Sequence, residues 1–143
     1  MNNGIEVEVI WLDQNVLEFL CSYSNGRFSG HAEIYVSHDK LSELAEGLSG
    51  FPSHLKDSRD FELGTFNPDH ADGGIRMHFC CTDSQGHAAV EVKLRGDACK
   101  GLGEVESVAL RIPVQAAAVD SFVSQIKQME KLVGATAYLQ MAK

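Results

Sequence analysis

The sequence has few basic residues. Twelve Lys and Arg stand against twenty Asp and Glu, so the formal net charge is −8 at pH 7 and the pI is about 5.1. An acidic surface repels phosphate backbones and anionic headgroups, so we expect neither nucleic acid nor a membrane as partner. If the charge contributes to function, the partner is basic. The alternative is that the charge serves solubility alone.

Long apolar runs are also absent. No stretch approaches the ~20 apolar residues that a membrane-spanning helix needs. The opening "MNNGIEVEVIW" has no basic segment followed by an apolar one. We therefore expect no signal peptide and a cytoplasmic protein.

Cysteine is present but poorly placed for disulfides. The four are Cys21, Cys80, Cys81 and Cys99. Two of them are adjacent, and a strand would direct them to opposite faces. Together with the absence of a signal peptide, this predicts reduced thiols.

The overall composition is typical of a single globular domain. The chain has 143 residues, of which 44% are hydrophobic and 22% charged. No repeat, linker or low-complexity tract divides it, so we expect a single domain over residues 1–143. Residues 135–143 form a tail whose structure the pattern does not predict.

Alternating apolar and polar residues predict most of the strands. Residues 5–12 place Ile5, Val7, Val9 and Trp11 on one face. Further strands are expected at 16–23, 27–36, 61–66, 75–82, 87–95 and 105–114. Asn25-Gly26 predicts a hairpin between the second and third of these. The core face of the third strand is expected to carry Phe28, Gly30, Ala32, Ile34 and Val36.

Two helices are predicted from apolar positions three and four residues apart. Leu41, Leu44, Ala45 and Leu48 form one stripe, which predicts a helix beginning near Asp39, with Ser37 as its cap and Gly50 after its end. Val119, Phe122, Val123, Ile126, Met129 and Val133 form another stripe, before Gly134. The predicted class is α+β. We expect a mostly antiparallel sheet of about six to seven strands with two helices packed on one face, leaving the other face polar.

The stretch "MHFCCTDSQGH" (77–87) is predicted to be part of a hairpin. A four-residue loop at 83–86 would place His78 opposite Glu91 and Cys80 opposite Ala89. The apolar faces of both strands then coincide without a register slip. In that register Cys81 points to the core and Cys80 to the other face.

The same stretch raises the question of metal or nucleophile chemistry. His78, Cys80 and His87 lie near one another, but the sequence has no C-x-x-C or H-x₃-H partner for a zinc site. A catalytic Cys80 would lie in the middle of a strand in an acidic chain, which is unfavourable for a thiolate. We expect no metal, no cofactor and no enzymatic activity. An enzymatic or small-ligand module that uses this His/Cys/Glu cluster remains the alternative.

The polar sheet face is the predicted binding surface. The residues assigned to it are Glu33, Tyr35, Arg76, His78 and Glu91. Aromatic, histidine and arginine side chains on an exposed sheet suit protein recognition. A further alternative is a homodimer formed through an exposed edge strand or the tail.

Two segments resemble a known group of proteins. "FSGHAEIYVSHDKLSELAEGLSGFP" (28–52) contains F-x-G-x-x-x-x-Y-V, a short helix pattern and L-x-G-F-P, and "DSQGHAAVEVKL" (83–94) contains D-x-x-G-H-x-x-V-x-V. With "VDSFVSQI" (119–126), they resemble small bacterial proteins that include WapI-type immunity proteins of contact-dependent toxin systems.

The resemblance covers roughly residues 16–133 and its shared positions specify the fold. It implies no catalytic residue. It implies an immunity protein that binds a basic toxin domain and occludes the toxin's substrate site.

Overall fold

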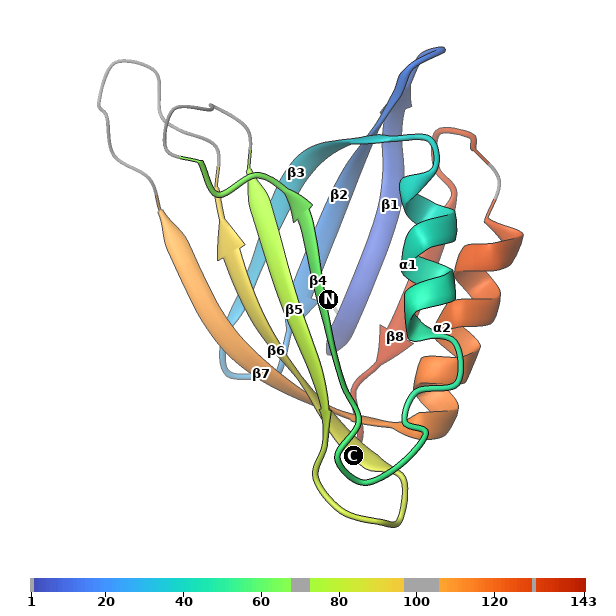
Figure 1. Ribbon diagram of the computed structural model, residues 1–143. Helices are drawn as coiled ribbons and strands as arrows, with labels where there is room; N and C mark the ends of the chain where they lie inside the picture. The colour runs from blue at the N-terminus through green and yellow to red at the C-terminus, as the bar shows by residue number, and fades with distance from the viewer. Residues whose placement is uncertain (1, 68–72, 97–105, 130) are drawn as a thin grey trace.

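The computed structural model describes residues 2–67, 73–96, 106–129 and 131–143. It contains eight strands and two helices (Figure 1). In chain order they are β1 (Gly4–Leu12), β2 (Val16–Ser24), β3 (Ser29–Ser37), α1 (Lys40–Leu48), β4 (Ser58–Gly64), β5 (Gly74–Cys81), β6 (His87–Arg95), β7 (Ser107–Gln115), α2 (Ala116–Gln128) and β8 (Thr136–Gln140). Cys99 lies outside the described residues.

The strands form two antiparallel sheets. Sheet A has the order β3-β2-β1-β8, and sheet B has the order β4-β5-β6-β7. The predicted α+β class, the antiparallel pairing and the two helices are confirmed. The strand total is eight rather than six or seven, and the strands divide between two sheets rather than forming one.

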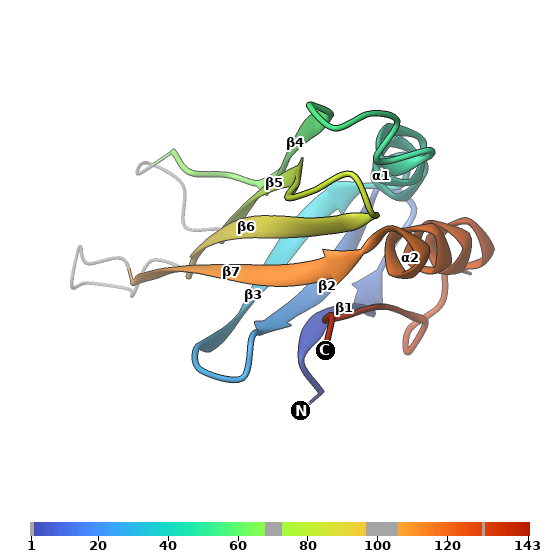
Figure 2. The ribbon, with the colours of Figure 1, turned by 90° about the horizontal axis from the view of Figure 1, so that it is seen from below.

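Each helix carries the chain from one sheet to the other. α1 connects β3 of sheet A to β4 of sheet B, and α2 connects β7 of sheet B to β8 of sheet A. Both helices therefore lie on the same side of the molecule, next to each other (Figures 1 and 2). Neither helix lies over the outward face of a sheet.

The core lies between the two sheets. The Tyr23 hydroxyl of β2 donates to the Met77 sulfur of β5 over 3.4 Å. A side chain at Gly30 of β3 would meet Val108 and Leu94 of sheet B at about 3 Å, so the glycine lets the sheets approach closely here. Because the inner faces cover each other, the outer faces of the sheets point in opposite directions.

The predicted hairpin at 77–87 is confirmed in register. His78 pairs with Glu91 and Cys80 pairs with Ala89. The amide of Thr82 donates to the carbonyl of His87 at the loop. Cys81, predicted to lie in the core, is only half-buried at the end of β5, where the inner face runs out.

A β-bulge in β1 overturns the predicted position of Trp11. Val9 pairs with Phe19, but Trp11 pairs with Glu18, which leaves Ile10 as an extra residue. An extra residue reverses the alternation beyond it. Trp11 therefore points outward and is 44% exposed, instead of joining the core.

The expected core role of Phe28 is also wrong. Phe28 precedes β3 in the Asn25–Phe28 turn and is exposed. The Asn25 side-chain oxygen accepts from the amides of Arg27 and Phe28, so turn geometry decides the place of this ring. The hairpin predicted at Asn25-Gly26 is confirmed, with a turn of four residues.

The helix boundaries differ from the pattern in two places. Asp39, rather than Ser37, is the N-cap residue of α1, and it makes no side-chain capping hydrogen bond. α2 ends at Gln128, so Val133 is exposed rather than part of its stripe. Pairing with β1 draws the chain away from the helix, since the amide of Gly134 donates to Val9.

The tail forms strand β8 at the edge of sheet A. It pairs with β1, and the Gln125 side chain of α2 occupies the other edge. The Gln125 amide donates to the Tyr138 carbonyl over 3.1 Å and its oxygen accepts from the Tyr138 amide over 2.9 Å. A side chain thus provides hydrogen bonds that another strand would otherwise provide.

We predict that Gln125→Ala lowers the free energy of unfolding by about 1–3 kcal/mol, because two backbone groups of a partly buried edge lose their partners. Chemical denaturation measures the change. Gln128→Ala, on the exposed side of the same helix, is the control and should stay within about 0.5 kcal/mol. Equal stability of the two variants would contradict the role assigned to Gln125.

A partly buried ion pair connects the end of α1 to β4. The Arg59 guanidinium lies 2.8 Å from the Asp57 carboxylate and also donates to the carbonyls of Gly47 and Ser49. The Asp57 carboxylate accepts from the amide of Ser53. These hydrogen bonds, led by the one from Arg59, lower the pKa of Asp57 from 3.8 to about 2.

The pKa of Asp57 is lower in the folded protein than in the unfolded chain, where it is near 4. The ionised carboxylate therefore stabilises the fold fully at pH values above about 4. That contribution is lost as the pH falls toward 2. We predict that Asp57→Asn is less stable than the parent by on the order of 1–2 kcal/mol at pH 7, with the gap closing as the pH falls from 4 to 2. Urea midpoints measured across this range test it, and a constant gap would contradict it.

Candidate functional site

The five residues predicted to share one surface lie on two faces. Glu33 and Tyr35 project outward from β3 of sheet A. Arg76 and His78 project outward from β5, and Glu91 from β6, of sheet B. Because the chain forms two sheets packed through their apolar sides, the structure does not bring the two groups together.

The outer face of sheet B carries opposite charges in pairs. Arg76 contacts Glu62 at 2.7 Å and Arg111 contacts Glu91 at 2.9 Å. His78 Nδ1 lies 2.7 Å from the carboxylate of Asp60. We call this surface the paired face, and define it by Asp60, Glu62, Arg76, His78, Glu91, Lys93 and Arg111.

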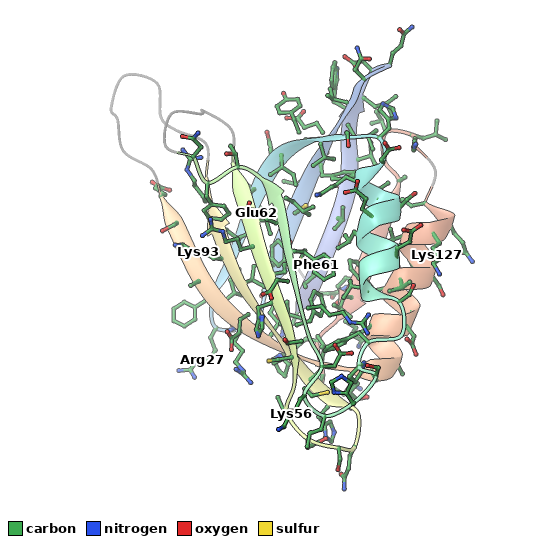
Figure 3. All side chains as sticks on the ribbon, in the orientation of Figure 1. Arg27, Lys56, Phe61, Glu62, Lys93 and Lys127 are labelled. Carbon is green, nitrogen blue, oxygen red and sulfur yellow. The ribbon has the colours of Figure 1, made fainter. Side chains whose placement is uncertain are left out.

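The paired face is hollowed into a depression of about 870 Å³. At one end, the Arg76 guanidinium lies 4.2 Å from the centre of the Phe66 ring, and the Lys93 ammonium lies 5.9 Å from it. Figure 3 shows Lys93 and Glu62 on this side, while Phe61 points toward α1. The charged groups are about half exposed, so each pair adds little to stability and mainly neutralises its neighbour.

The His/Cys residues of the hairpin have separate local partners. His87 Nδ1 lies 2.5 Å from the Asp83 carboxylate in the loop, and His78 pairs with Asp60. The Cys80 thiol faces the carbonyl of Ala89. Within the described ranges, no three His, Cys, Asp or Glu residues are grouped as metal ligands.

The two adjacent thiols, Cys80 and Cys81, differ in their surroundings. Burial, with help from nearby carboxylates, raises the pKa of Cys81. Cys80 is partly buried, and its thiol lies 3.8 Å from the backbone carbonyl of Ala89. A raised pKa disfavours the thiolate that nucleophilic catalysis requires.

The outer face of sheet A has the opposite character. Its four strands contain four glutamates and neither Lys nor Arg. None of Glu6, Glu8, Glu18 and Glu33 has an ion-pair partner among the residues that the structure describes. Apart from the buried pair Gly4 and Ser24 at one end, the outward positions of these strands are exposed or half-buried, so no described helix or strand packs over them.

We call this surface the acidic face, and its side chains form three cross-strand rows. The rows are Trp11–Glu18–Tyr35, then Thr136–Glu8–Leu20–Glu33, then Tyr138–Glu6–Ser22–His31. Aromatic, aliphatic and acidic side chains alternate across it. Such a mixture of large contact area and a single charge sign suits recognition of a cationic protein surface.

Trp11 and Tyr35 form the aromatic end of the acidic face. Their ring centres are 6.4 Å apart with the planes at 76°, which is an edge-to-face contact. Trp11 belongs to β1 and Tyr35 to β3, and β2 separates these two strands. The rings therefore lean toward each other across β2, the strand that carries Glu18. Both rings remain roughly half exposed.

The acidic face also affects a neighbouring phenol. Tyr138 lies in the row of Glu6 and donates its hydroxyl to the Asn3 carbonyl over 2.5 Å. Burial and the carboxylate of Glu6 raise the pKa of Tyr138. The phenol therefore stays neutral, and the charge of this face comes from its glutamates.

Sequence reasoning identified Glu33 and Tyr35 of this face but missed Trp11, Glu6, Glu8 and Glu18. The sequence did contain a signal for the unpaired glutamates, because residues 2–37 include only one Lys or Arg, Arg27, that could pair with them. Nothing in the sequence pattern predicted the outward position of Trp11, because that position depends on the β-bulge at Ile10. The outward position of Glu18 follows from alternation within β2.

No family model, curated protein or solved structure matches this chain. In the part of the chain that the structure describes, neither helix is long and apolar enough to cross a membrane.

The unpaired glutamates should produce a negative potential around Trp11, the only tryptophan in the chain. We predict that Cs⁺ quenches its fluorescence more strongly than iodide does, by roughly twofold, once each constant is divided by that of N-acetyltryptophanamide at the same ionic strength. Glu8→Gln/Glu18→Gln should lower this ratio. Glu62→Gln/Glu91→Gln, an equal charge change on the paired face, should not. A parent ratio at or below one would contradict the predicted potential.

Proposed function

We propose that this chain is a non-enzymatic protein-binding domain that receives a basic partner on its acidic face. The observation that carries the proposal is the contrast between the two outer faces. On the paired face each carboxylate has a cationic or histidine partner, whereas the four glutamates of the acidic face have none among the described residues. A partner that supplies the missing cations would complete the pairing.

Binding of this kind has an electrostatic and a contact component. The net charge of −8 attracts a basic partner over distance and raises the association rate. Exposed Trp11 and Tyr35 then offer rigid aromatic area, which is typical of the residues that dominate interface energies. Once docked, the sheet covers the partner's surface and excludes its substrate.

Occlusion of this type is the mode of action expected of an immunity protein. The resemblance to WapI-type immunity proteins supports the same proposal, with a basic toxin domain as the partner. On this proposal the domain acts in the cytoplasm of a bacterium. Its role requires neither a metal nor a cofactor.

A small-ligand site is the second candidate. The depression of about 870 Å³ on the paired face favours it, since it has the volume of a ligand site and includes Arg76, His78 and Glu91. The charges that line it already neutralise one another within the fold. A ligand would have to replace existing ion pairs, which makes this the weaker candidate.

A homodimer through the tail is disfavoured by the position of β8. One edge of β8 pairs with β1, and Gln125 bonds to the other edge. Dimerisation through another strand edge stays a prediction.

The proposal predicts a partner held by salt-sensitive contacts with the acidic face. The tagged chain is used to capture proteins from its native lysate at low and at high salt. We expect a basic partner that is released by salt, and Glu6→Gln/Glu8→Gln/Glu33→Gln should weaken its binding by about tenfold, or about 1.4 kcal/mol.

The matched control is Asp60→Asn/Glu62→Gln/Glu91→Gln, which removes the same charge from the paired face. It should change binding by less than about twofold, because each carboxylate there is already neutralised by a neighbour. A partner that both triple variants bind equally well would contradict the assignment of the face. Absence of any partner at either salt, from cells that express it, would contradict protein binding.

A further inference from the structure

The single tryptophan of the chain lies on the surface because of a backbone irregularity. Without the bulge at Ile10, the alternation of β1 would direct Trp11 into the core with Val7 and Val9. The bulge instead places Trp11 opposite Glu18, and Leu12 packs against the core in its place. β-Bulges commonly re-aim a side chain at a functional site.

The bulge completes a row of three side chains with complementary properties. Trp11 pairs with Glu18 across β1 and β2, and Glu18 pairs with Tyr35 across β2 and β3. In this register Glu18 lies between two aromatic residues, on the face where the four strands contain no Lys or Arg. The two rings of this row contact each other edge to face, with their planes at 76°.

Each part of this row attracts a cation. The faces of Trp and Tyr rings attract ammonium and guanidinium groups, and Trp is the strongest of the aromatic residues in this respect. A carboxylate accepts hydrogen bonds from the same groups. Trp11 and Tyr35 are 44% and 47% exposed, so a side chain from solvent can reach them.

We propose that Trp11, Glu18 and Tyr35 form a receptor for one arginine side chain of the partner. This deepens the proposed function and rests on it, since it names one anchor of the basic surface that the acidic face receives. Arginine fits better than lysine because its planar guanidinium stacks on a ring while its N–H groups reach a carboxylate. Lysine presents a compact, strongly hydrated charge that gains less from the rings.

The receptor can be tested without the partner. The full-length ¹⁵N-labelled chain is titrated with the blocked peptides acetyl-Gly-Arg-Gly-amide, acetyl-Gly-Lys-Gly-amide and acetyl-Gly-Gln-Gly-amide. The indole N–H signal is the readout, because the chain has one tryptophan. We expect saturable binding of the arginine peptide, weaker binding of the lysine peptide and no saturable shift with the glutamine peptide.

Substitutions then distinguish binding at the receptor from non-specific electrostatic attraction of the peptide to the acidic protein. Glu18→Gln should weaken arginine binding by about fivefold, while Glu62→Gln on the paired face should change it by less than about twofold. Tyr35→Phe should retain binding and Tyr35→Leu should lose it, which separates the ring from any hydroxyl contact. The dispersion of the amide spectrum shows that each variant is folded.

Three results would overturn the receptor. They are equal shifts with the arginine and glutamine peptides, tighter binding of lysine than of arginine, and equal effects of Glu18→Gln and Glu62→Gln. The proposed function is tested by different residues, Glu6, Glu8 and Glu33. If those substitutions abolish partner capture while the peptides fail to bind, the acidic face is retained and only the arginine receptor is rejected.

Discussion

Each sheet of this protein is apolar on one face only, and these two faces enclose a single core together with the apolar sides of α1 and α2. The whole arrangement follows from that constraint. The chain must pass between the sheets twice, and α1 and α2 make the two crossings on the same side (Figure 2). Because both helices lie at this side of the two sheets, neither covers an outer face, and the outer faces stay open to solvent. The fold therefore offers two separate surfaces, one formed by sheet A and one by sheet B.

Features that depend on neighbouring residues could be predicted from the sequence. The hairpin joining β5 and β6 has a clear alternation on both strands, and the four-residue loop closes it in a register that places both apolar sets on one side, so His78 was correctly placed opposite Glu91. The same holds for β2 and β3, where Ala32, Ile34 and Val36 are buried as expected. α1 is also where its stripe of apolar residues predicts.

Features that depend on distant segments could not be predicted in this way. The alternation of a strand identifies its apolar face but not its sheet, so Tyr35 and Arg76 were assigned to one surface although they lie on opposite sides. The bulge at Ile10 is likewise invisible in the pattern, since "EVEVIWL" alternates well enough to place Trp11 inside. β8 was missed because its five residues become a strand only beside β1 and Gln125. In each case a contact across the fold overrides the local preference.

The distribution of charge on the acidic face is the reason for proposing that this face binds a partner. Solubility is served equally well by a face on which both signs alternate, and the chain builds such a face on sheet B. On sheet A, Glu8 and Glu33 occupy one row with only Leu20 between them, and Glu6 is two residues from Glu8 along β1. Glu6 and Glu8 lie about 7 Å apart along the strand, within a Debye length of about 8 Å, so their charges repel each other and oppose folding, whereas Glu8 and Glu33, two strands apart, are about 10 Å apart and repel each other more weakly. The exposed aromatic rings of the same face add area that burial would stabilise. Both costs would be removed if a basic surface with apolar contacts covered the face, and this is the arrangement that the proposed function requires.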